Sequence, residues 1–265
     1  MRIARNGLPI AASDAAFSWG SGIVTSGEGW FETMRGEAGR WMFAEAHLDR
    51  LARGVEVAGL DGSAARAAAA GTLAALSANA VETERVRLVV TPELSARSGW
   101  SAVAVAAHYN APTREYERGV TLVSAGFPHP GLGQFGKSVS YHWSAVAQRQ
   151  AVAAGADEAV FWRDGAVAEA ARAAVIWQER GRWFTPDRPD LLASVTLAQF
   201  EACGISVERA RLDTARLEAV DGLALVSSLR LVVPVVAVDG RIVPNCAVES
   251  ARLRTALLRL HASAA

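Results

Sequence analysis

Lysine is almost absent from this sequence. Lysine and arginine together number 27 among the 265 residues, and only one of them, Lys137, is a lysine, so 26 are arginines. Arginine replaces lysine wherever only a positive charge is needed, but it does not release a proton near neutral pH or attack a carbonyl carbon. Lys137 is therefore a candidate nucleophile. The alternative is that a composition rich in arginine and alanine left one lysine by chance.

Other absences narrow the class of protein. The two cysteines, Cys203 and Cys246, have neither metal nor redox spacing and make no disulfide framework, which favours the reducing cytoplasm. The five histidines show no metal-binding spacing, and no glycine-rich nucleotide-binding loop is present. Apolar runs such as 231–238 are only as long as a strand, and the N-terminus has no apolar signal core, so we expect no membrane segment.

Charge of either sign is not in excess, because 27 acidic residues balance the 27 basic ones. The arginines are interleaved with acids along the chain, which indicates no surface for nucleic acid or for an anionic membrane. A chain that is 51% hydrophobic and 20% charged has an ordinary globular composition. Its length favours two compact domains.

Hydrophobic patterning predicts a small N-terminal α+β domain over residues 1–110. Its expected elements are short strands near 30–34 and 40–43, helices over 45–60 and 63–80, and an antiparallel strand pair at 85–91 and 101–109. The polar segment 111–119 is the expected linker. It leads to a larger domain, residues 120–265.

Lys137 lies at a loop-to-helix junction of this second domain. The expected elements, in order, are a strand at 120–124, a Gly- and Pro-rich loop at 126–136, a helix at 141–154, a hairpin of 158–162 with 166–170, a strand at 173–177, a helix at 195–203, strands near 223–226 and 232–238, and a helix at 248–261.

Several motifs occur in an order that resembles fold type IV pyridoxal-phosphate enzymes. The central one begins at Lys137-Ser-Val-Ser-Tyr141 and continues after one helix with Gly-Ala-Asp-Glu-Ala at 155–159 and Asp-Gly-x-Val-x-Glu at 164–169. The others are Glu-x-His-Leu-x-Arg-Leu at 45–51, Thr-Pro at 185–186, Ser-Val-Thr at 194–196, Ser-Ser-Leu-Arg at 227–230 and Pro-Val at 234–235. The family includes branched-chain and D-amino-acid aminotransferases and 4-amino-4-deoxychorismate lyase.

The resemblance implies a role for each matching residue. Lys137 is the amine that forms the internal aldimine with pyridoxal 5′-phosphate and then moves protons at the substrate carbon. Glu169 is the carboxylate that keeps the cofactor ring nitrogen protonated, and Tyr141 either touches the cofactor or caps the helix core. Arg50 holds the phosphate. The rest of the phosphate cradle is expected from the start of the helix near 195 and from the 227–228 turn, and its residues are Ser194, Val195, Thr196, Ser227 and Ser228.

Substrate choice depends on groups that bind carboxylates. The loop 95–101, Ser-Ala-Arg-Ser-Gly-Trp-Ser, is similar to the arginine-containing loop of aminodeoxychorismate lyases, which makes Arg97 the candidate substrate ligand, with Trp30 as a second one. The pair Arg85-Val-Arg87 lacks the aromatic residue that branched-chain aminotransferases carry there. The resemblance therefore favours the lyase, which releases 4-aminobenzoate and pyruvate in folate synthesis.

Departures from the family pattern keep two alternatives open. Ala174 stands where an asparagine is usual, Leu197 where an arginine is usual and Ser194 where a glycine is usual, and residues 21–26 resemble an insertion. The first alternative is an aminotransferase for branched-chain or D-amino acids. The second is a non-catalytic homologue that serves as a binding or partner subunit.

The resemblance also implies the architecture. It is an α+β, two-domain, D-amino-acid/branched-chain aminotransferase-like fold, with a small α/β N-terminal domain and a C-terminal pseudobarrel. The cofactor is expected in the cleft between the domains. A small-molecule substrate and a homodimer are further expectations.

Overall fold

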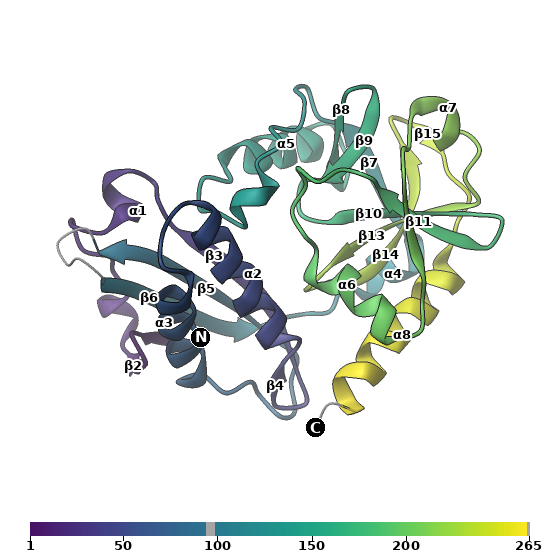
Figure 1. Cartoon of the computed structure of the whole chain (residues 1–265). Helices are drawn as coiled ribbons and strands as arrows, with labels where there is room; N and C mark the ends of the chain where they lie inside the picture. The colour runs from purple at the N-terminus through teal and green to yellow at the C-terminus, as the bar shows by residue number, and fades with distance from the viewer. Residues whose placement is uncertain (94–98, 264–265) are drawn as a thin grey trace. The chain divides into compact units, whose positions relative to one another are not determined.

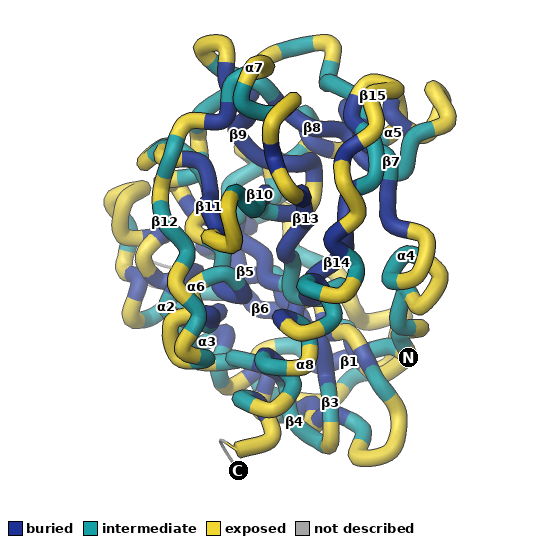
Figure 2. The backbone as a smooth tube through the Cα atoms, turned by 90° about the vertical axis from the view of Figure 1, so that its right-hand side faces the viewer, coloured by how far each residue is buried: buried dark blue, intermediate teal, exposed yellow. Residues whose placement is uncertain are grey.

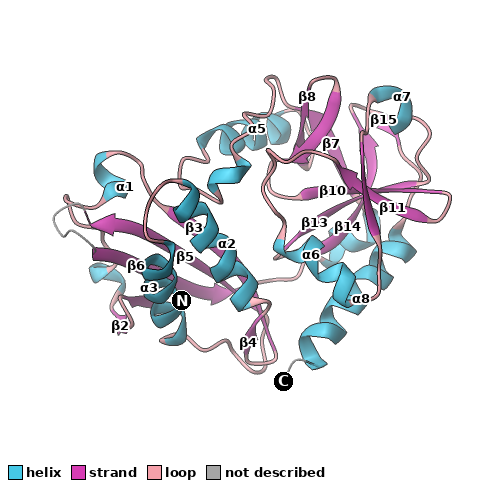
Figure 3. Ribbon diagram, viewed as in Figure 1, coloured by secondary structure: helices cyan, strands magenta, loops and turns pink. Residues whose placement is uncertain are grey.

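The computed structural model describes residues 1–93 and 99–263. The chain folds into two compact units, the first made of Met1–Ala111 with Leu132–Tyr141 and the second of Pro112–Gly131 with His142–Ala265 (Figures 1 and 3). The segment that carries Lys137 therefore belongs to the first unit, whereas the sequence analysis assigned it to the second domain. The expected linker is not extended throughout, because Thr113–Arg118 forms the short helix α4.

An antiparallel sheet forms the centre of the first unit. Its strand order is β2 (Leu8–Ile10), β1 (Arg2–Arg5), β6 (Gly99–His108), β5 (Glu84–Glu93), β3 (Trp30–Glu37) and β4 (Arg40–Trp41). The helices α2 (Ala44–Val57) and α3 (Gly62–Ala74) lie on one face of this sheet (Figure 1). The short helix α1 (Gly22–Thr25) and the 3₁₀ turns η1 (Ala12–Asp14) and η2 (Gly133–Phe135) complete the unit.

Alternation of side chains explains how this sheet packs. On β5, Val86, Leu88 and Val90 are fully buried, while Arg85 and Arg87 point to the opposite face. The buried side chains of β5 and of its neighbours join Leu48 and Leu51 of α2 in one core. A strand buried on one face and polar on the other is what the sequence pattern predicts.

A larger, mixed sheet forms the second unit. Its order in the described part of the chain is β12 (Val207–Ala210), β11 (Arg182–Pro186), β10 (Ala174–Glu179), β13 (Gly222–Ser227), β14 (Leu231–Val238), β7 (Val120–Ser124), β8 (Glu158–Arg163) and β9 (Ala166–Ala170), with β15 (Arg241–Ile242) beside β14. The helices are α5 (His142–Ala153), α6 (Val195–Ala202), α7 (Thr214–Leu217) and α8 (Ala247–Ser263).

The two ends of this sheet curl toward each other. The Val167 N–H of β9 donates to Leu212 O beyond β12 at 2.8 Å, and the Ala170 N–H donates to Ala173 O at 2.9 Å. The enclosed core comes from the inward faces of these strands, and the central strands β13 and β14 are buried along most of their length (Figure 2). The α+β class and the pseudobarrel expected from the sequence are confirmed.

The hairpin between β8 and β9 follows its sequence signal. Asp164 and Gly165 both have positive φ, 53° and 71°, as a two-residue turn between twisted strands requires. This turn places Glu169 on β9, three residues after the start of the strand. None of the helices in residues 1–93 and 99–263 is both long and apolar enough to cross a membrane.

Candidate functional site

Lys137 lies in a segment that pairs with the start of β3 through an isolated antiparallel bridge between Trp30 and Ser138. The Phe31 N–H donates to Lys137 O at 2.8 Å, and the Val139 N–H donates to Gly29 O at 2.9 Å. The helix α5 begins five residues later, at His142. These backbone bonds fix the position of Lys137 on the first unit.

Trp30 anchors the loop that leads to Lys137. Its indole Nε1–H donates to Phe135 O at 2.8 Å, and its ring lies 6.2 Å from that of Trp100. The side chain is buried in the core between β3 and α2. In these contacts Trp30 supports the lysine segment. The sequence had instead predicted that Trp30 binds the substrate.

The Lys137 amine lies between two aromatic rings. Its Nζ is 4.7 Å from the Phe31 ring centre and 4.5 Å from that of Tyr141, and the two rings meet edge to face at 5.6 Å. Tyr141, for which two roles were left open, thus contacts the lysine side chain. A cation against ring faces is stabilised electrostatically, and the rings restrict where the amine can point.

Arg87 shares one of these rings, and the sequence analysis did not select it. Its guanidinium carbon is 3.9 Å from the Phe31 ring centre. The side chain reaches solvent, yet enough of the guanidinium is covered that burial, and then the charge of Arg85, lowers the pKa of Arg87. Among residues 1–93 and 99–263, no carboxylate pairs with it. The register Thr33 to Arg87 on β3 and β5 could not be read from the sequence, although the outward alternation of β5 could.

A buried ion-pair cluster lies on the other face of β3. Arg50 donates through Nε to Oε1 of Glu32 at 2.8 Å and through Nη2 to Oε2, and Nδ1 of His47 is 2.6 Å from Oε2. Arg50 and His47 are three residues apart on α2 and so share one side of that helix. Glu32 has no exposed surface.

The charges in this cluster set its protonation. Burial alone would raise the pKa of Glu32, but the charge of Arg50, then that of His47, and hydrogen bonds from both lower it to about 2. Burial lowers the pKa of His47, and the charges of Arg50 and Lys137 act in the same direction, against the opposing effect of Glu32. At neutral pH the carboxylate is therefore ionised and the imidazole is neutral, with its Nδ1–H donated to Glu32.

Arg50, the predicted phosphate ligand, is thus held in place by a residue that the sequence analysis missed. Glu32 keeps one edge of the guanidinium fixed. Its position along β3 could have revealed it. Glu32 is two residues from both Trp30 and Met34, so the three side chains lie on the same face of the strand, toward the core of the unit. A carboxylate at an inward position requires a buried partner.

Glu169 belongs to the second unit. Its Oε1 is 2.8 Å from Nε2 of His129, and both residues are buried. Among the described residues no group bonds Oε2. One oxygen is therefore fixed, and the other remains an acceptor for a donor from a ligand.

The predicted phosphate residues come together from two parts of the second unit. Ser194 is the N-cap of α6, where its hydroxyl accepts the Leu197 N–H at 3.3 Å. The Thr196 hydroxyl lies 3.4 Å from that of Ser228, in the turn between β13 and β14. The Val195 and Thr196 amides stand in the first helical turn, where amides lack an intrahelical acceptor and favour an anion. Ser227 ends β13.

A mostly covered arginine, Arg230, holds this turn. Arg230 pairs with Glu158 through Nη2 and with Glu115 at 3.4 Å, and its carbonyl accepts the Tyr116 hydroxyl at 3.1 Å. Burial alone would lower the pKa of Arg230, but the charges of Glu158 and Glu115 raise it. Glu158 also accepts the Arg172 N–H at 2.7 Å. The cluster ties β8 and α4 to the 228–230 turn.

The departures from the family pattern occupy ordinary positions in the fold. Ala174 opens β10 opposite Val226, and Leu197 contributes only its amide to the Ser194 cap. Residues 22–25 of the apparent insertion form α1, and the Ile23 N–H bonds to the Thr91 hydroxyl at 2.8 Å. Arg97, the predicted substrate ligand, lies outside the described residues.

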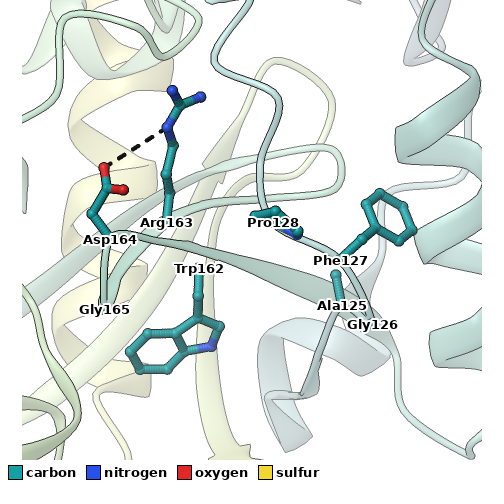
Figure 4. A pocket seen from close by; sticks show the side chains of 8 residues that line it. All are labelled: Ala125, Gly126, Phe127, Pro128, Trp162, Arg163, Asp164 and Gly165. Carbon is teal, nitrogen blue, oxygen red and sulfur yellow. Dashed lines mark ion pairs between the residues drawn. The ribbon is translucent and has the colours of Figure 1, made fainter.

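The second unit also has an open surface hollow that contains none of the predicted residues. It measures about 340 Å³ and is formed by 125–128 and by the β8–β9 turn, where Arg163 and Asp164 approach to 3.8 Å (Figure 4). Within the described residues no group of three or more His, Cys, Asp and Glu could hold a metal ion.

Each unit, taken by itself, carries groups of the kind that pyridoxal phosphate requires. The first unit supplies a single lysine amine against two rings, and the second supplies a carboxylate with one unbonded oxygen and a pair of hydroxyls at a helix N-terminus. An aldehyde needs the amine, a protonated pyridine nitrogen needs the carboxylate, and a phosphate needs the helix start.

Solved structures of known proteins share this fold. Solved structures similar to this chain include the fold IV transaminase CpuTA1 of Curtobacterium pusillum, with 24% identity, coverage of 97% of this chain and 98% of that one, and a TM-score of 0.81. A hypothetical aminotransferase of Mycobacterium tuberculosis in its PLP-bound form is 22% identical, covers 100% of this chain and 99% of its own, and has a TM-score of 0.81. The branched-chain amino acid aminotransferase of Escherichia coli is 18% identical, covers 98% of this chain and 94% of its own, and has a TM-score of 0.81. At these identities the likeness shows the fold. Curated protein sequences give no significant match.

The family assignment comes from the sequence profile. The profile described as Amino-transferase class IV matches residues 29–238, which run from just before β3 to the end of β14. The matched span includes the lysine segment, the hairpin with Glu169 and the residues predicted to bind phosphate. The chain therefore belongs to the class IV aminotransferase family, whose members are pyridoxal-phosphate-dependent enzymes.

Proposed function

We propose that this protein is a pyridoxal-phosphate-dependent aminotransferase whose substrate carries both a primary amine and a carboxylate. One observation carries the proposal: the Lys137 amine and the Arg87 guanidinium lie against the same Phe31 ring, at 4.7 and 3.9 Å from its centre. A nucleophilic amine beside a cation that no described carboxylate neutralises suits a substrate with an amino and a carboxylate group.

The chemistry is divided between the cofactor and the protein. When bound, pyridoxal phosphate supplies an aldehyde that takes up the substrate amine and a ring that withdraws electrons from the adjacent carbon. Lys137 accepts the proton from that carbon on Nζ and returns it at a different atom. Phe31 and Tyr141 restrict the amine to the positions from which it can do so.

The other residues bind and orient. Arg87 holds the substrate carboxylate through its planar guanidinium. Glu169 offers Oε2 to the protonated ring nitrogen. Arg50, fixed by Glu32, and the Thr196 and Ser228 hydroxyls are the proposed phosphate donors.

Covalent trapping tests the attachment. Purified protein is incubated with pyridoxal phosphate, reduced with borohydride, digested and mapped by mass spectrometry, with Lys137→Arg as the control because it retains the charge. We expect the pyridoxyl adduct on Lys137 alone. An unlabelled Lys137 peptide would reject both the proposal and its catalytic alternatives, and would favour a non-catalytic homologue.

Half-reactions test transamination. An amino-acid panel, including branched-chain and D-amino acids, is mixed with the loaded enzyme, and the release of keto acid is measured with the conversion of the cofactor to its amine form. Arg87→Leu should reduce turnover of carboxylate-bearing amines by roughly 10²-fold and leave the turnover of simple alkyl amines unchanged. Equal losses of turnover for carboxylate-bearing and simple alkyl amines would show that Arg87 does not bind the substrate carboxylate.

A second candidate is 4-amino-4-deoxychorismate lyase activity. It is supported by the loop 95–101 with Arg97, and it uses the same lysine proton transfer to eliminate pyruvate. The assay is formation of 4-aminobenzoate with Lys137→Ala as the blank. If 4-aminobenzoate formed only at the blank rate while the amino-acid panel released keto acid, the lyase would be excluded and the aminotransferase supported.

We further propose that the enzyme is a homodimer in the cytoplasm. The resemblance to the family supports the dimer, and two cysteines without disulfide spacing support the compartment. Sedimentation equilibrium of the loaded protein tests the first, and fractionation of the source cells tests the second. A monomer in solution would contradict the proposed dimer, and recovery of the protein outside the cytoplasm would contradict the proposed location.

A further inference from the structure

His129 has a set of contacts that goes beyond filling space. It lies in the loop before Gly131, is 3% exposed, and directs Nε2 at Glu169 Oε1 over 2.8 Å. Its ring meets those of Trp143 and Phe161 nearly edge to face, at 5.0 and 5.6 Å. A buried imidazole enclosed in this way has one orientation available to it.

The second nitrogen of the ring decides which atom carries the proton. The Gly131 N–H donates to Nδ1 of His129 at 3.0 Å. Because Nδ1 accepts this bond, it carries no proton, and the proton of the neutral ring must be on Nε2. His129 therefore donates Nε2–H to Glu169 as a neutral residue. The Glu169 carboxylate is oriented without having its charge cancelled by an ion pair.

The loop that presents this N–H is itself constrained. Gly131 has φ of 72°, and a Cβ there would lie 1.9 Å from Nη1 of Arg163. Arg163 donates Nη1–H to His129 O at 3.2 Å, and its Nε lies 3.4 Å from Asp190. The left-handed backbone favours a glycine at 131, and a side chain there would displace the Arg163 guanidinium. The tautomer of His129 is thus set by the local backbone.

We propose that His129 is a positioning residue for Glu169. Its Nε2–H holds Oε1 and leaves Oε2 as the oxygen that receives a protonated ring nitrogen. A protonated imidazole would neutralise the carboxylate, whereas the neutral tautomer leaves its full negative charge to stabilise the ring cation. This inference rests on the proposed cofactor.

The first experiment needs no cofactor. A long-range ¹H–¹⁵N spectrum of the cofactor-free protein, with His129 assigned by comparison with His129→Gln, reports the tautomer directly. We expect a neutral ring protonated on Nε2 at about pH 8. Protonation on Nδ1 would overturn the inference whether or not the protein binds pyridoxal phosphate.

The second experiment measures cofactor affinity. His129→Phe keeps an aromatic ring between Trp143 and Phe161 but has no donor, and it should weaken pyridoxal phosphate binding roughly tenfold. His129→Gln can still donate an amide N–H and should recover most of the affinity. Phe161→Leu is the control, because it alters the same aromatic packing and leaves the hydrogen bond, so its affinity should stay within about twofold.

Coupling to Glu169 separates positioning from folding. In a Glu169→Gln background, His129→Phe should cause no further loss of affinity, because the oriented carboxylate is already gone. An equal loss in both backgrounds would show that His129 acts only through the fold and would overturn the inference. Failure of the wild-type protein to bind pyridoxal phosphate would instead contradict the proposed function, and the tautomer measurement would still test His129.

Discussion

Gly54 of α2 touches Gly136, the residue immediately before Lys137. A Cβ on Gly54 would lie 2.9 Å from the Gly136 Cα and 2.8 Å from Phe135 O, and a Cβ on Gly136 would lie 3.0 Å from the Gly54 Cα. Real Cβ atoms essentially never show contacts under 3.0 Å, so a Cβ on Gly54 would force a shift. The lysine segment can therefore rest on α2 only because both residues lack a side chain.

The contact predicts the effect of one methyl group. Gly54→Ala should push the 135–137 segment away from α2 and destabilise the protein by about 1–3 kcal/mol, as overpacking does. It should also slow covalent attachment of pyridoxal phosphate to Lys137, followed by absorbance. The matched control is Gly71→Ala in α3, where a Cβ meets nothing within 4 Å. That change should stabilise the protein by roughly 0.5–1 kcal/mol, because alanine favours the helix.

The Glu32 cluster predicts a large loss on neutralisation. Glu32→Gln leaves the buried Arg50 charge without the Glu32 carboxylate, and we expect the unfolding free energy to fall by about 3–5 kcal/mol. Urea denaturation measures it. Glu45→Gln is the control, since Glu45 is 79% exposed and pairs with Arg66 at the surface. Its effect should be below about 1 kcal/mol. If both variants lost a similar amount of unfolding free energy, burial of the Glu32–Arg50 pair would not explain the loss.

Acid should destabilise the protein in two stages. The pKa of His47 is lowered from 6.5, so below that pH the unfolded chain takes up a proton that the folded protein resists. The pKa of Glu32 is lowered from 4.5 to about 2, so its contribution is complete above pH 4.5 and is lost as the pH falls toward 2. That shift corresponds to roughly 3 kcal/mol.

Urea midpoints from about pH 8 to about pH 3 measure the two stages. His47→Gln should remove the upper one, because glutamine can donate to Glu32 and does not titrate. If the variant lost stability below pH 6.5 as steeply as the wild type, His47 would not be the group responsible.

The phosphate-binding role proposed for Thr196 and Ser228 predicts a selective loss of affinity. Thr196→Val removes the hydroxyl that lies 3.4 Å from Ser228 and keeps the side-chain shape, so binding of pyridoxal phosphate should weaken about tenfold. Binding of pyridoxal, which has no phosphate, should be unchanged. Thr196→Ser should behave like the wild type. Equal losses for both ligands would place Thr196 away from the phosphate.

Arg230 predicts a strong coupling with Glu158. Arg230→Met removes the nearer of the two arginines that pair with the buried Glu158 carboxylate, the other being Arg172 at 3.8 Å, and should cost about 3–5 kcal/mol of unfolding free energy. In the double variant with Glu158→Gln the loss should be smaller than the sum of the single losses. Additive losses in urea denaturation would show that the two side chains act independently.

Several features followed from the sequence because they depend on local geometry. The hairpin at Asp164-Gly165 needs two residues that accept positive φ, and α6 begins at Ser194 because a serine caps the first turn. Alternation along β5 gave the buried face of the first sheet. Composition alone distinguished Lys137, since one lysine among 27 basic residues has chemistry that the others lack.

Long-range packing decided the rest. The pairs Glu32–Arg50, Arg87–Phe31 and Glu169–His129 join residues 18, 56 and 40 positions apart. The 131–132 crossing, which places Lys137 with the first unit, has no local signal because it depends on Gly54 and Gly136 meeting. The sequence by itself determined the chemistry available to this protein and most of its local elements. Only the tertiary structure decided which charges share a buried site, because strand register and close packing between distant segments bring those groups together.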